Sequence, residues 1–375
     1  SWNIIMNIMS ASPHAPIITP SLRTRRTPFS DGVEKAGVKS YTIYNHMLLA
    51  SQFGDFIQDY HHLKEHVQIW DVAVQRQVRI KGRDAQKLMH LLSPRDITKM
   101  SNDQCFYIPL VDQSGGMLND PVALKIQENE YWISIADSDY LLYALGVADA
   151  LYLDVQIDEP DISPLAVQGP KADELMCKVF GNEVRDIKFF RYKKLSFEGR
   201  EMVIARSGYS KQGGFEIYVD EFKYGMPLWE KLLAEGEDLN VRVGCPNLIE
   251  RIEGGLLSYG NDITRENTPF EAGLGKFINS KESFIGRKSL ERRPFTKKIL
   301  PISISGEIPP CDRHWDVFLG GRAIGKITSA IFSPDFECNV AIGMIDIPAG
   351  VAGTQVEVQT HIGMRNARIC SKFWI

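Results

Sequence analysis

The residues best suited to chemistry in this chain are a carboxylate and a phenol that follow a glycine-rich turn. The segment 213–218 begins with two glycines and continues with the apolar and aromatic residues typical of a β-strand. Side chains alternate along a strand, so Glu216 and Tyr218 share one face while Phe215 and Ile217 point to the packed side. The segment alone fits a ligand site and a solvated hairpin face equally well.

A second acid lies at the exit of a predicted hairpin. The turn 114–116 contains Gly-Gly and separates the apolar runs Cys105–Val111 and Val122–Ile126. Asp120 follows this turn, and on the residues alone it suits a turn cap as well as a binding site. Tyr107 lies in the first run, where an aromatic residue fits a packed core as well as a pocket wall.

A third segment is predicted to be a helix that carries an arginine. Apolar residues recur at helical spacing from Asn247 to a Tyr-Gly-Asn-Asp stop at 259–262. Arg251 lies within it, with Glu250 and Glu253 as ordinary charge partners on the helix surface.

Composition indicates a globular enzyme without an obvious macromolecular partner. The chain has 375 residues, is 44% hydrophobic and 24% charged, and can form two or three domains with a large core. A net charge of -4 gives no basic footprint for nucleic acid. The six cysteines are scattered without a Cys-x-x-Cys pair, which argues against a zinc site or a disulfide framework and favours a cytoplasmic location. No apolar run reaches the roughly 20 residues of a membrane helix.

Four histidines gather near the start of the chain without forming a recognisable metal site. His62 and His66 have helical i, i+4 spacing, but no acid completes a ligand set with them, nor with His46 and His61. We expect no metal, and a role for these residues in helix surface and packing.

The chain is expected to divide into three regions. Residues 1–20 are expected to form a flexible N-terminal segment outside the fold. Residues 21–291 alternate strand-like and helix-like segments, which predicts two intertwined α+β domains. Residues 295–375 read as a small β-barrel or sandwich. Its predicted strands are Ala323–Ala330, Asn339–Ile345, Gln355–Thr360 and Met364–Ser371.

Ordered motifs along nearly the whole chain resemble the glycine-cleavage T-protein family of tetrahydrofolate-dependent enzymes. The resemblance implies a three-domain cloverleaf of class α+β, with two mixed α/β domains and a C-terminal β-barrel around a central folate cavity. Besides the three segments above, it rests on Trp70-Asp71-Val72, Ile80–Ala85, Val167–Ala172, Thr268–Leu274, Phe284–Leu290 and Ile324–Ser329.

Several local patterns are more similar to the dimethylsulfoniopropionate demethylases of this family than to T-protein itself. T-protein has paired aspartates where Asn119-Asp120 stands, and Thr-Gly-Glu-Asp-Gly where Ser210–Gly214 stands. Tyr209 is the departure, because the demethylase pattern is expected to have tryptophan there. The demethylase-like patterns are Tyr44–Leu49, His62–Val67, Asn119–Val122, Ile135–Asp139 and Ser210–Gly214.

The resemblance implies roles for the three candidate segments. Glu216 matches the glutamate that binds the pterin, and a carboxylate can accept the parallel N–H donors of that edge in bidentate geometry. Arg251 and Tyr107 match residues of the folate pocket. Asp120 matches the catalytic acid that lies near the reacting nitrogens N5 and N10.

A cationic methyl donor suggests further candidates. Tyr218, as a catalytic and substrate-binding residue, and Tyr209 can offer a π face or a phenolic oxygen to a sulfonium. For the carboxylate of the donor, Lys211, Arg206 and the backbone of the 213–214 turn remain alternatives.

The implied reaction is methyl transfer from dimethylsulfoniopropionate to N5 of tetrahydrofolate, which serves as the methyl acceptor, giving methylmercaptopropionate. The alternatives are demethylation of glycine betaine or another methylated amine, glycine-cleavage aminomethyl transfer, and a non-catalytic folate-binding role. The expected partner is a small-molecule substrate, with neither nucleic acid nor membrane, and a homodimer is one option for the oligomeric state. A flavin-dependent reaction is disfavoured because the chain lacks a Gly-x-Gly-x-x-Gly fingerprint.

Overall fold

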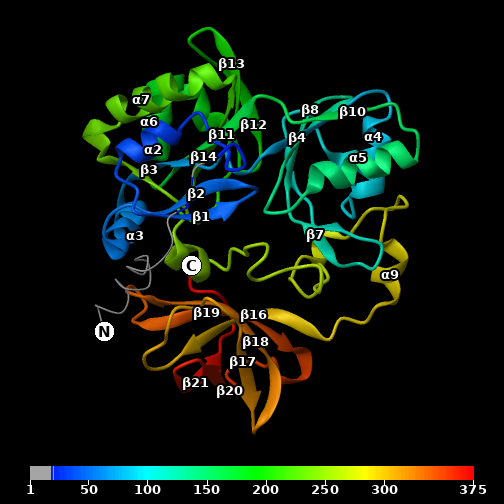
Figure 1. The fold of residues 1–375 in the computed structure, drawn as a ribbon, viewed down its shortest axis with the longest axis vertical. Helices are drawn as coiled ribbons and strands as arrows, with labels where there is room; N and C mark the ends of the chain where they lie inside the picture. Colours follow the sequence, from blue (N-terminus) through cyan, green and yellow to red (C-terminus); the bar gives the residue numbers. More distant parts are fainter. Residues whose placement is uncertain (1–17, 20) are drawn as a thin grey trace.

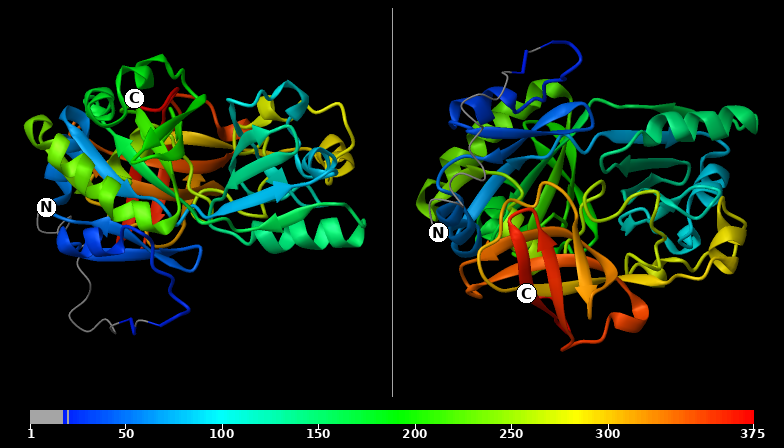
Figure 2. Two further views of the ribbon diagram at one scale, coloured as in Figure 1. Left: turned by 90° about the horizontal axis from the view of Figure 1, so that it is seen from above. Right: turned by 60° about the horizontal axis from the view of Figure 1, so that its bottom comes forward.

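The computed structural model describes residues 18–19 and 21–375, so the predicted N-terminal segment 1–20 lies almost entirely outside the described residues. The chain forms a six-stranded sheet, a five-stranded sheet and a closed barrel, together with two small hairpins. The two sheet-containing lobes lie side by side, and the barrel packs below them (Figures 1 and 2). This arrangement is the predicted cloverleaf of two mixed α/β parts and a β-barrel.

The six-stranded sheet is covered on one face by helices. Phe215 and Ile217 belong to the core between this face and the helices, as predicted. The covering helices are α2 (Ser30–Lys35), α6 (Ala172–Phe180) and α7 (Gly225–Glu235). The strand order is β12 (Tyr192–Phe197), β13 (Arg200–Ala205), β14 (Gly214–Asp220), β11 (Ile162–Gln168), β3 (Val67–Asp71) and β15 (Val241–Gly244).

The five-stranded sheet is an insertion in the sequence of the six-stranded sheet. The chain leaves the six-stranded sheet after β3, forms the five-stranded sheet, and returns with β11. Helices α4 (Ala85–Leu92) and α5 (Tyr140–Ala150) pack on one of its faces. The strand order is β10 (Gln156–Asp158), β4 (Gln77–Lys81), β9 (Glu130–Ser134), β8 (Val122–Gln127) and β5 (Cys105–Tyr107).

The free faces of the two sheets pack against each other. Leu124 and Ile126 of β8 share a buried cluster with Val203 of β13 and Tyr218 of β14. Glu216 projects from the same face of β14 as Tyr218, since residues two apart share a face. The face that carries Glu216 and Tyr218 is therefore buried too, which excludes the solvated hairpin that the sequence left open.

Two hairpins reach toward the centre of the molecule. The predicted hairpin around Gly115-Gly116 is confirmed, because β6 pairs with β7 across this turn while β5 pairs with β8 outside it. A second hairpin near the N-terminus turns at Asn45 and His46. The strands are β1 (Ser40–Tyr44) with β2 (Met47–Gln52), and β6 (Leu110–Val111) with β7 (Met117–Asn119).

The predicted arginine-bearing helix is shorter than the sequence pattern indicates. Asn247 caps α8 (Leu248–Glu253) by accepting from the backbone N–H groups of Ile249 and Glu250, both at 3.1 Å. The helix ends at Gly254, and Gly255 has a φ of +65°. The predicted continuation to the Tyr-Gly-Asn-Asp stop was wrong because this glycine pair ends the helix.

The C-terminal region is a closed barrel rather than a sandwich, with the strand order β16-β19-β18-β17-β20-β21. Its four predicted strands are present, and β16 and β17 were not predicted. The strands are β16 (Lys297–Ile304), β17 (Trp315–Leu319), β18 (Arg322–Ser333), β19 (Cys338–Asp346), β20 (Gln355–Thr360) and β21 (Gly363–Ile369).

Helices α3 (Phe56–Glu65) and α8 pack on the outside of barrel strands β18 and β19, which joins the barrel to the lobe that contains the six-stranded sheet. Within the described residues, no helix is both long and apolar enough to cross a membrane. The remaining helices are α9 (Arg287–Arg292) and the short 3-10 turns Ile97–Lys99, Asn182–Asp186, Phe222–Tyr224, Glu237–Leu239, Gly275–Phe277 and Ile347–Ala349.

Candidate active site

Glu216 lies on β14 at a point where glycine lets two strands approach closely. Gly214 has a φ of +137°, and a Cβ there would come within 2.1 Å of the Val167 carbonyl oxygen. Ser207 donates a 2.7 Å hydrogen bond to Oε1 of Glu216. Burial raises the pKa of Glu216, and the Ser207 bond partly opposes this shift. Within the described chain, no other residue bonds to the carboxylate, so Oε2 keeps its capacity for a ligand.

Tyr218 lies deeper between the two sheets than Glu216. Only 1% of its surface is exposed, and it packs with Cys105 and Val203, with its ring centroid 6.4 Å from that of Trp132. Burial raises the pKa of Tyr218, and the nearby charge of Glu216 adds to the shift. The position favours packing, and the catalytic and donor-binding roles of Tyr218 stay predictions.

Asp120 follows β7 and lies opposite the end of β5. The Tyr107 hydroxyl donates a 2.7 Å hydrogen bond to Oδ2 of Asp120, which brings together two residues predicted to share the site. Burial raises the pKa of Asp120 to about 7, while the Tyr107 bond opposes the shift. A half-buried carboxyl that titrates near neutrality can take up or release a proton during a reaction.

Four tyrosines lie near enough to this carboxylate for its charge to affect them. Burial is the main cause that raises the pKa of Tyr44, Tyr107, Tyr209 and Tyr259, and the charge of Asp120 contributes to each shift. All four side chains are half-buried. Tyr44 and Tyr259 were not predicted to belong to the site, although both lie in motifs recognised from the sequence.

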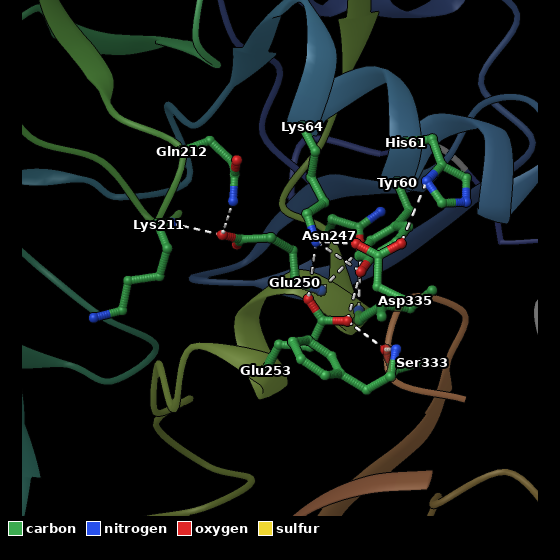
Figure 3. Close-up of polar contacts among 12 residues, drawn as sticks. Tyr60, His61, Lys64, Lys211, Gln212, Asn247, Glu250, Glu253, Ser333 and Asp335 are labelled. Carbon is green, nitrogen blue, oxygen red and sulfur yellow. Dashed lines mark hydrogen bonds and ion pairs between the residues drawn. The ribbon is translucent and has the colours of Figure 1, made fainter. Parts of the chain in front are cut away.

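The loop that carries Tyr209 is fastened to α8 and to the chain that follows it. The Tyr209 hydroxyl donates to the Leu257 carbonyl at 2.8 Å, and the Lys211 backbone N–H donates to Oε1 of Glu250 at 2.6 Å. The Lys211 side chain is exposed and points away from Glu250 (Figure 3). Its ammonium group makes no hydrogen bond or ion pair with the described residues.

Arg206 was an alternative to Lys211 for the carboxylate of the donor, but its guanidinium is already occupied. It binds Asp173 through two hydrogen bonds of 2.9 and 3.1 Å, donates to the Val184 carbonyl, and lies over the Phe215 ring. These contacts hold the start of α6 against the sheet, which leaves Lys211 and the 213–214 backbone as the accessible alternatives.

Arg251 forms a buried ion pair with Asp262, at 2.8 Å. Burial is the largest influence on the pKa of Arg251 and would lower it, but the charge of Asp262, the hydrogen bond to it and the nearby Tyr209 together raise the pKa. Arg251 also donates to the Leu256 carbonyl and to Ser329 of β18. Arg251 also lines a cavity of about 470 Å³ between α8 and the barrel, whose wall includes Leu248, Asn261, Cys311 and Thr328.

The acids expected to pair with Arg251 bind elsewhere. Glu253 accepts 2.6 Å hydrogen bonds from Tyr60 of α3 and Ser333 of β18 (Figure 3). Next to Glu253, the ammonium of Lys64 donates to the Asp335 carboxylate. Glu250 holds the backbone of the Lys211 loop, as described above. The alternative of simple surface pairing for Arg251 is excluded, because both acids are fully buried and bind other partners.

The histidines serve packing where the structure shows their contacts. His62 is buried, with Nε2 2.6 Å from the Asn240 carbonyl oxygen, and burial lowers its pKa to about 4. His66 lies 3.1 Å from the ammonium of Lys171. No group of three or more metal-binding side chains occurs among residues 18–19 and 21–375.

Comparison with protein families decides the ancestry of this fold. The model of the GCVT N-terminal domain matches residues 29–282, and that of the glycine cleavage T-protein C-terminal barrel domain matches residues 297–375. The chain belongs to the glycine cleavage T-protein family. The crystal structure of aminomethyltransferase T from Bartonella henselae has the same fold, with a TM-score of 0.83 and 23% identity over 95% of this chain and 98% of that one.

Members of this T-protein family with different activities resemble the chain to different degrees. Dimethylsulfoniopropionate demethylase DmdA of Ruegeria pomeroyi is 59% identical over 360 residues, which cover 95% of this chain and 99% of the relative. An aminomethyltransferase of Caldanaerobacter subterraneus subsp. tengcongensis is 30% identical over 320 residues, 82% of this chain and 84% of the relative. The sequence identity to the demethylase is therefore about twice that to the aminomethyltransferase, and the match covers more of the chain.

Proposed function

We propose that this protein is a tetrahydrofolate-dependent demethylase that transfers a methyl group from dimethylsulfoniopropionate to N5 of tetrahydrofolate. The observation that carries the proposal is the 59% identity to a dimethylsulfoniopropionate demethylase across 95% of the chain. The products are methylmercaptopropionate and 5-methyltetrahydrofolate, and one proton is released.

Asp120 suits the proton balance of this reaction. The bond from the sulfonium sulfur to the methyl carbon breaks, its electron pair stays on the sulfur, and the donor leaves as a neutral thioether. Tetrahydrofolate supplies the nucleophilic nitrogen, whose N–H proton must be lost once the new carbon–nitrogen bond forms. With a pKa of about 7, Asp120 can receive that proton, and in its charged form it attracts the cationic donor.

Glu216 suits the pterin end of tetrahydrofolate. Its Oε2 oxygen is unoccupied by the described residues, and Ser207 fixes the orientation of the carboxylate through Oε1. A charged carboxylate in a water-poor site binds adjacent N–H donors strongly and with defined geometry. We assign Arg251, which lines the 470 Å³ cavity, to the distal part of the same molecule.

Tyrosine faces suit the sulfonium, and Lys211 suits the carboxylate at the other end of the donor. Each cation–π contact contributes about 0.5–2 kcal/mol, with the higher values for desolvated sites. Tyr209 is held in place by its hydroxyl bond to Leu257, so its ring offers a fixed surface beside Asp120. Close placement of donor and acceptor is the main catalytic task, because the leaving group needs no protonation.

The proposal also covers location and assembly. The six cysteines are free thiols, which suits the reducing cytoplasm, where we place the enzyme. The site takes a small-molecule donor, and a homodimer stays a prediction that light scattering of the purified protein can check.

The test is an anaerobic reaction of the purified protein with tetrahydrofolate and a donor whose S-methyl groups carry deuterium. Mass spectrometry should detect 5-methyltetrahydrofolate that is heavier by three mass units, together with methylmercaptopropionate. Parallel reactions contain labelled glycine betaine, labelled dimethylglycine, or an aminomethylated lipoyl carrier. Product from one of these donors and none from dimethylsulfoniopropionate would overturn the proposal, as would binding of tetrahydrofolate without any product.

A further inference from the structure

The backbone N–H and carbonyl groups of Ala136 are hydrogen-bonded by two asparagine side chains from different parts of the chain. Its carbonyl oxygen accepts from Nδ2 of Asn45 and from Nδ2 of Asn119, both at 3.0 Å. Its N–H donates to Oδ1 of Asn119 at 2.9 Å. We call these three residues the Ala136 clamp. It joins the β1–β2 hairpin, the end of β7 and the loop between β9 and α5.

In the clamp, the buried side-chain amide of each asparagine donates two hydrogen bonds from Nδ2. Asn45 also donates from Nδ2 to the Val74 carbonyl, and Asn119 donates to the Ser138 hydroxyl at 2.8 Å. Exposed fractions are 5% for Asn45 and 0% for Asn119. Buried polar groups with complete hydrogen bonding fix a local structure, because breaking one bond leaves an unsatisfied partner.

Two residues with half-buried side chains lie next to the clamp in the sequence. Asp120 directly follows Asn119, and Tyr44 directly precedes Asn45. In β1 the residues from Tyr41 to Ile43 are exposed, and Tyr44 at the tip is half-buried. The hairpin runs from the six-stranded lobe toward the centre of the molecule (Figure 1). The clamp therefore fixes the segments of Tyr44 and Asp120 relative to each other, because both asparagines bind the same carbonyl oxygen of Ala136.

The turn of the hairpin has left-handed backbone geometry and is tied to the same loop as the clamp. Asn45 and His46 have φ values of +49° and +63°, the left-handed geometry of a tight two-residue turn. The backbone N–H of Asn45 donates to the Asp137 carboxylate at 2.8 Å, which ties the turn itself to the same loop. The charge of Asp120 and the presence of Tyr209 raise the pKa of Tyr44 beyond the effect of burial, which agrees with its place beside both.

A carboxylate cannot replace Asn119 in this clamp. Aspartate has no N–H to donate, so the Ala136 carbonyl and the Ser138 hydroxyl would each lose a donor and face a negative charge. The T-protein pattern has aspartate at this position, so a chain of that pattern must hold its corresponding segments by other contacts.

We propose that the Ala136 clamp holds Tyr44 beside Asp120 as a wall of the methyl-donor pocket, where the Tyr44 ring binds the cationic end of the donor. Tyr44 is then a substrate-binding residue, and Asn45 and Asn119 are positioning residues. The inference rests on the proposed demethylase function, and it adds a selectivity element that the T-protein pattern lacks.

The first test compares Tyr44→Leu with Tyr44→Phe in steady-state assays that vary each substrate at saturating concentration of the other. We expect Tyr44→Leu to raise the KM for dimethylsulfoniopropionate about tenfold and to leave the KM for tetrahydrofolate within twofold. Tyr44→Phe keeps the aromatic face and should stay within threefold for both. Ile43→Ala, an exposed neighbour on the opposite face of β1, is the matched control.

The second test asks whether the clamp acts through Tyr44. Asn119→Asp should produce the same donor-specific rise in KM, and should add less than threefold when combined with Tyr44→Leu, because coupled residues are not additive. Asn129→Asp, at an exposed turn, is the control for the charge. Equal changes in both KM values, full additivity, or equal losses in Tyr44→Leu and Tyr44→Phe would overturn the proposal.

A third readout does not depend on the donor. Hydrogen exchange of the amides in the 40–52 hairpin should speed up at least tenfold in Asn119→Asp and stay unchanged in Asn129→Asp. Unchanged hydrogen exchange of the 40–52 amides in Asn119→Asp would contradict the positioning role of the clamp, even if the protein demethylates dimethylsulfoniopropionate. If the unmodified protein forms no product from that donor, the proposed function fails while the clamp still stands or falls on hydrogen exchange.

Discussion

Two sets of buried charges differ in how much of their hydrogen-bonding capacity the protein itself uses. Asp262 accepts four hydrogen bonds, including the bond from Arg251. Asp120 and Glu216 each accept one from another side chain in the part of the chain that the structure describes. Charged side chains whose hydrogen-bonding capacity is used by the protein hold elements together. Those with unused hydrogen-bonding capacity remain available to a ligand. Arg251 belongs to both classes, because it joins α8 to the barrel and still borders a cavity.

The largest effect of this difference should appear in the Arg251→Met variant, as a loss of stability. Removing the guanidinium leaves Asp262 buried without its cation, which costs about 3–5 kcal/mol. Thermal or urea unfolding followed by circular dichroism measures the change. Arg265→Met is the control, because Arg265 pairs with Asp112 at 3.0 Å on the surface and should contribute about 1 kcal/mol or less. Equal losses in the two variants would contradict the structural role of the Arg251 pair.

Replacement of Asp120 by asparagine should affect chemistry far more than binding. We expect about a hundredfold loss of single-turnover rate in Asp120→Asn, because the proton acceptor is lost, and tetrahydrofolate affinity within threefold. Rapid-quench mass spectrometry measures the rate, and Asp149→Asn on the exposed side of α5 is the control. A rate within twofold of that of the unmodified protein would remove Asp120 from the mechanism.

The Asp120→Asn variant, although expected to be slower, should be more stable than the unmodified protein at high pH. The pKa of Asp120 is raised from 3.8 to about 7 in the folded protein, so the native state binds the proton more tightly than the unfolded state. Stability from this group is present at low pH and is lost as the pH rises from about 4 to 7. Asp120→Asn should therefore melt at a higher temperature than the unmodified protein at pH 8, with little difference at pH 4.

Glu216→Gln should produce a smaller effect that is specific to the acceptor. The amide keeps the size of the side chain and removes the charge, so the KM for tetrahydrofolate should rise about tenfold while that for the donor stays within twofold. Isothermal titration with tetrahydrofolate gives the binding change directly. A donor-specific rise would place Glu216 at the wrong end of the site.

Tyr218→Phe should have the smallest effect, with both KM values and kcat within about twofold. The ring packs between the two sheets, and the variant keeps the ring while it removes the hydroxyl. Steady-state assays of this variant test the catalytic role predicted from sequence, and a loss of kcat above tenfold would restore that role.

Local sequence patterns predicted much of this molecule, and the contacts that they missed are long-range. Alternation placed Glu216 and Tyr218 on one face, and the glycine turn located the hairpin before Asp120. Nothing in the β14 sequence shows that a second sheet covers that face. Helical spacing paired Arg251 with Glu250 and Glu253, but the turn at Gly254-Gly255 brings Asp262 to it instead.

The candidate site shows the same limit. The family resemblance implied that Tyr107 and Asp120 belong to one site, but it did not predict the 2.7 Å hydrogen bond that joins them. Tyr44 lies 76 residues from Asp120 in the sequence. The Ala136 clamp, whose three members come from separate segments, links the segments that carry the two residues. No local periodicity encodes such a contact.

The pH dependence of single-turnover methyl transfer tests most directly the claim that Asp120 is kept available for chemistry. With labelled dimethylsulfoniopropionate and saturating tetrahydrofolate, the rate of the unmodified protein should rise with pH through an apparent pKa near 7 and then level off. The Asp120→Asn variant should be slow and should lack this rise. The same rise in both proteins, or a flat profile in the unmodified protein, would contradict the account.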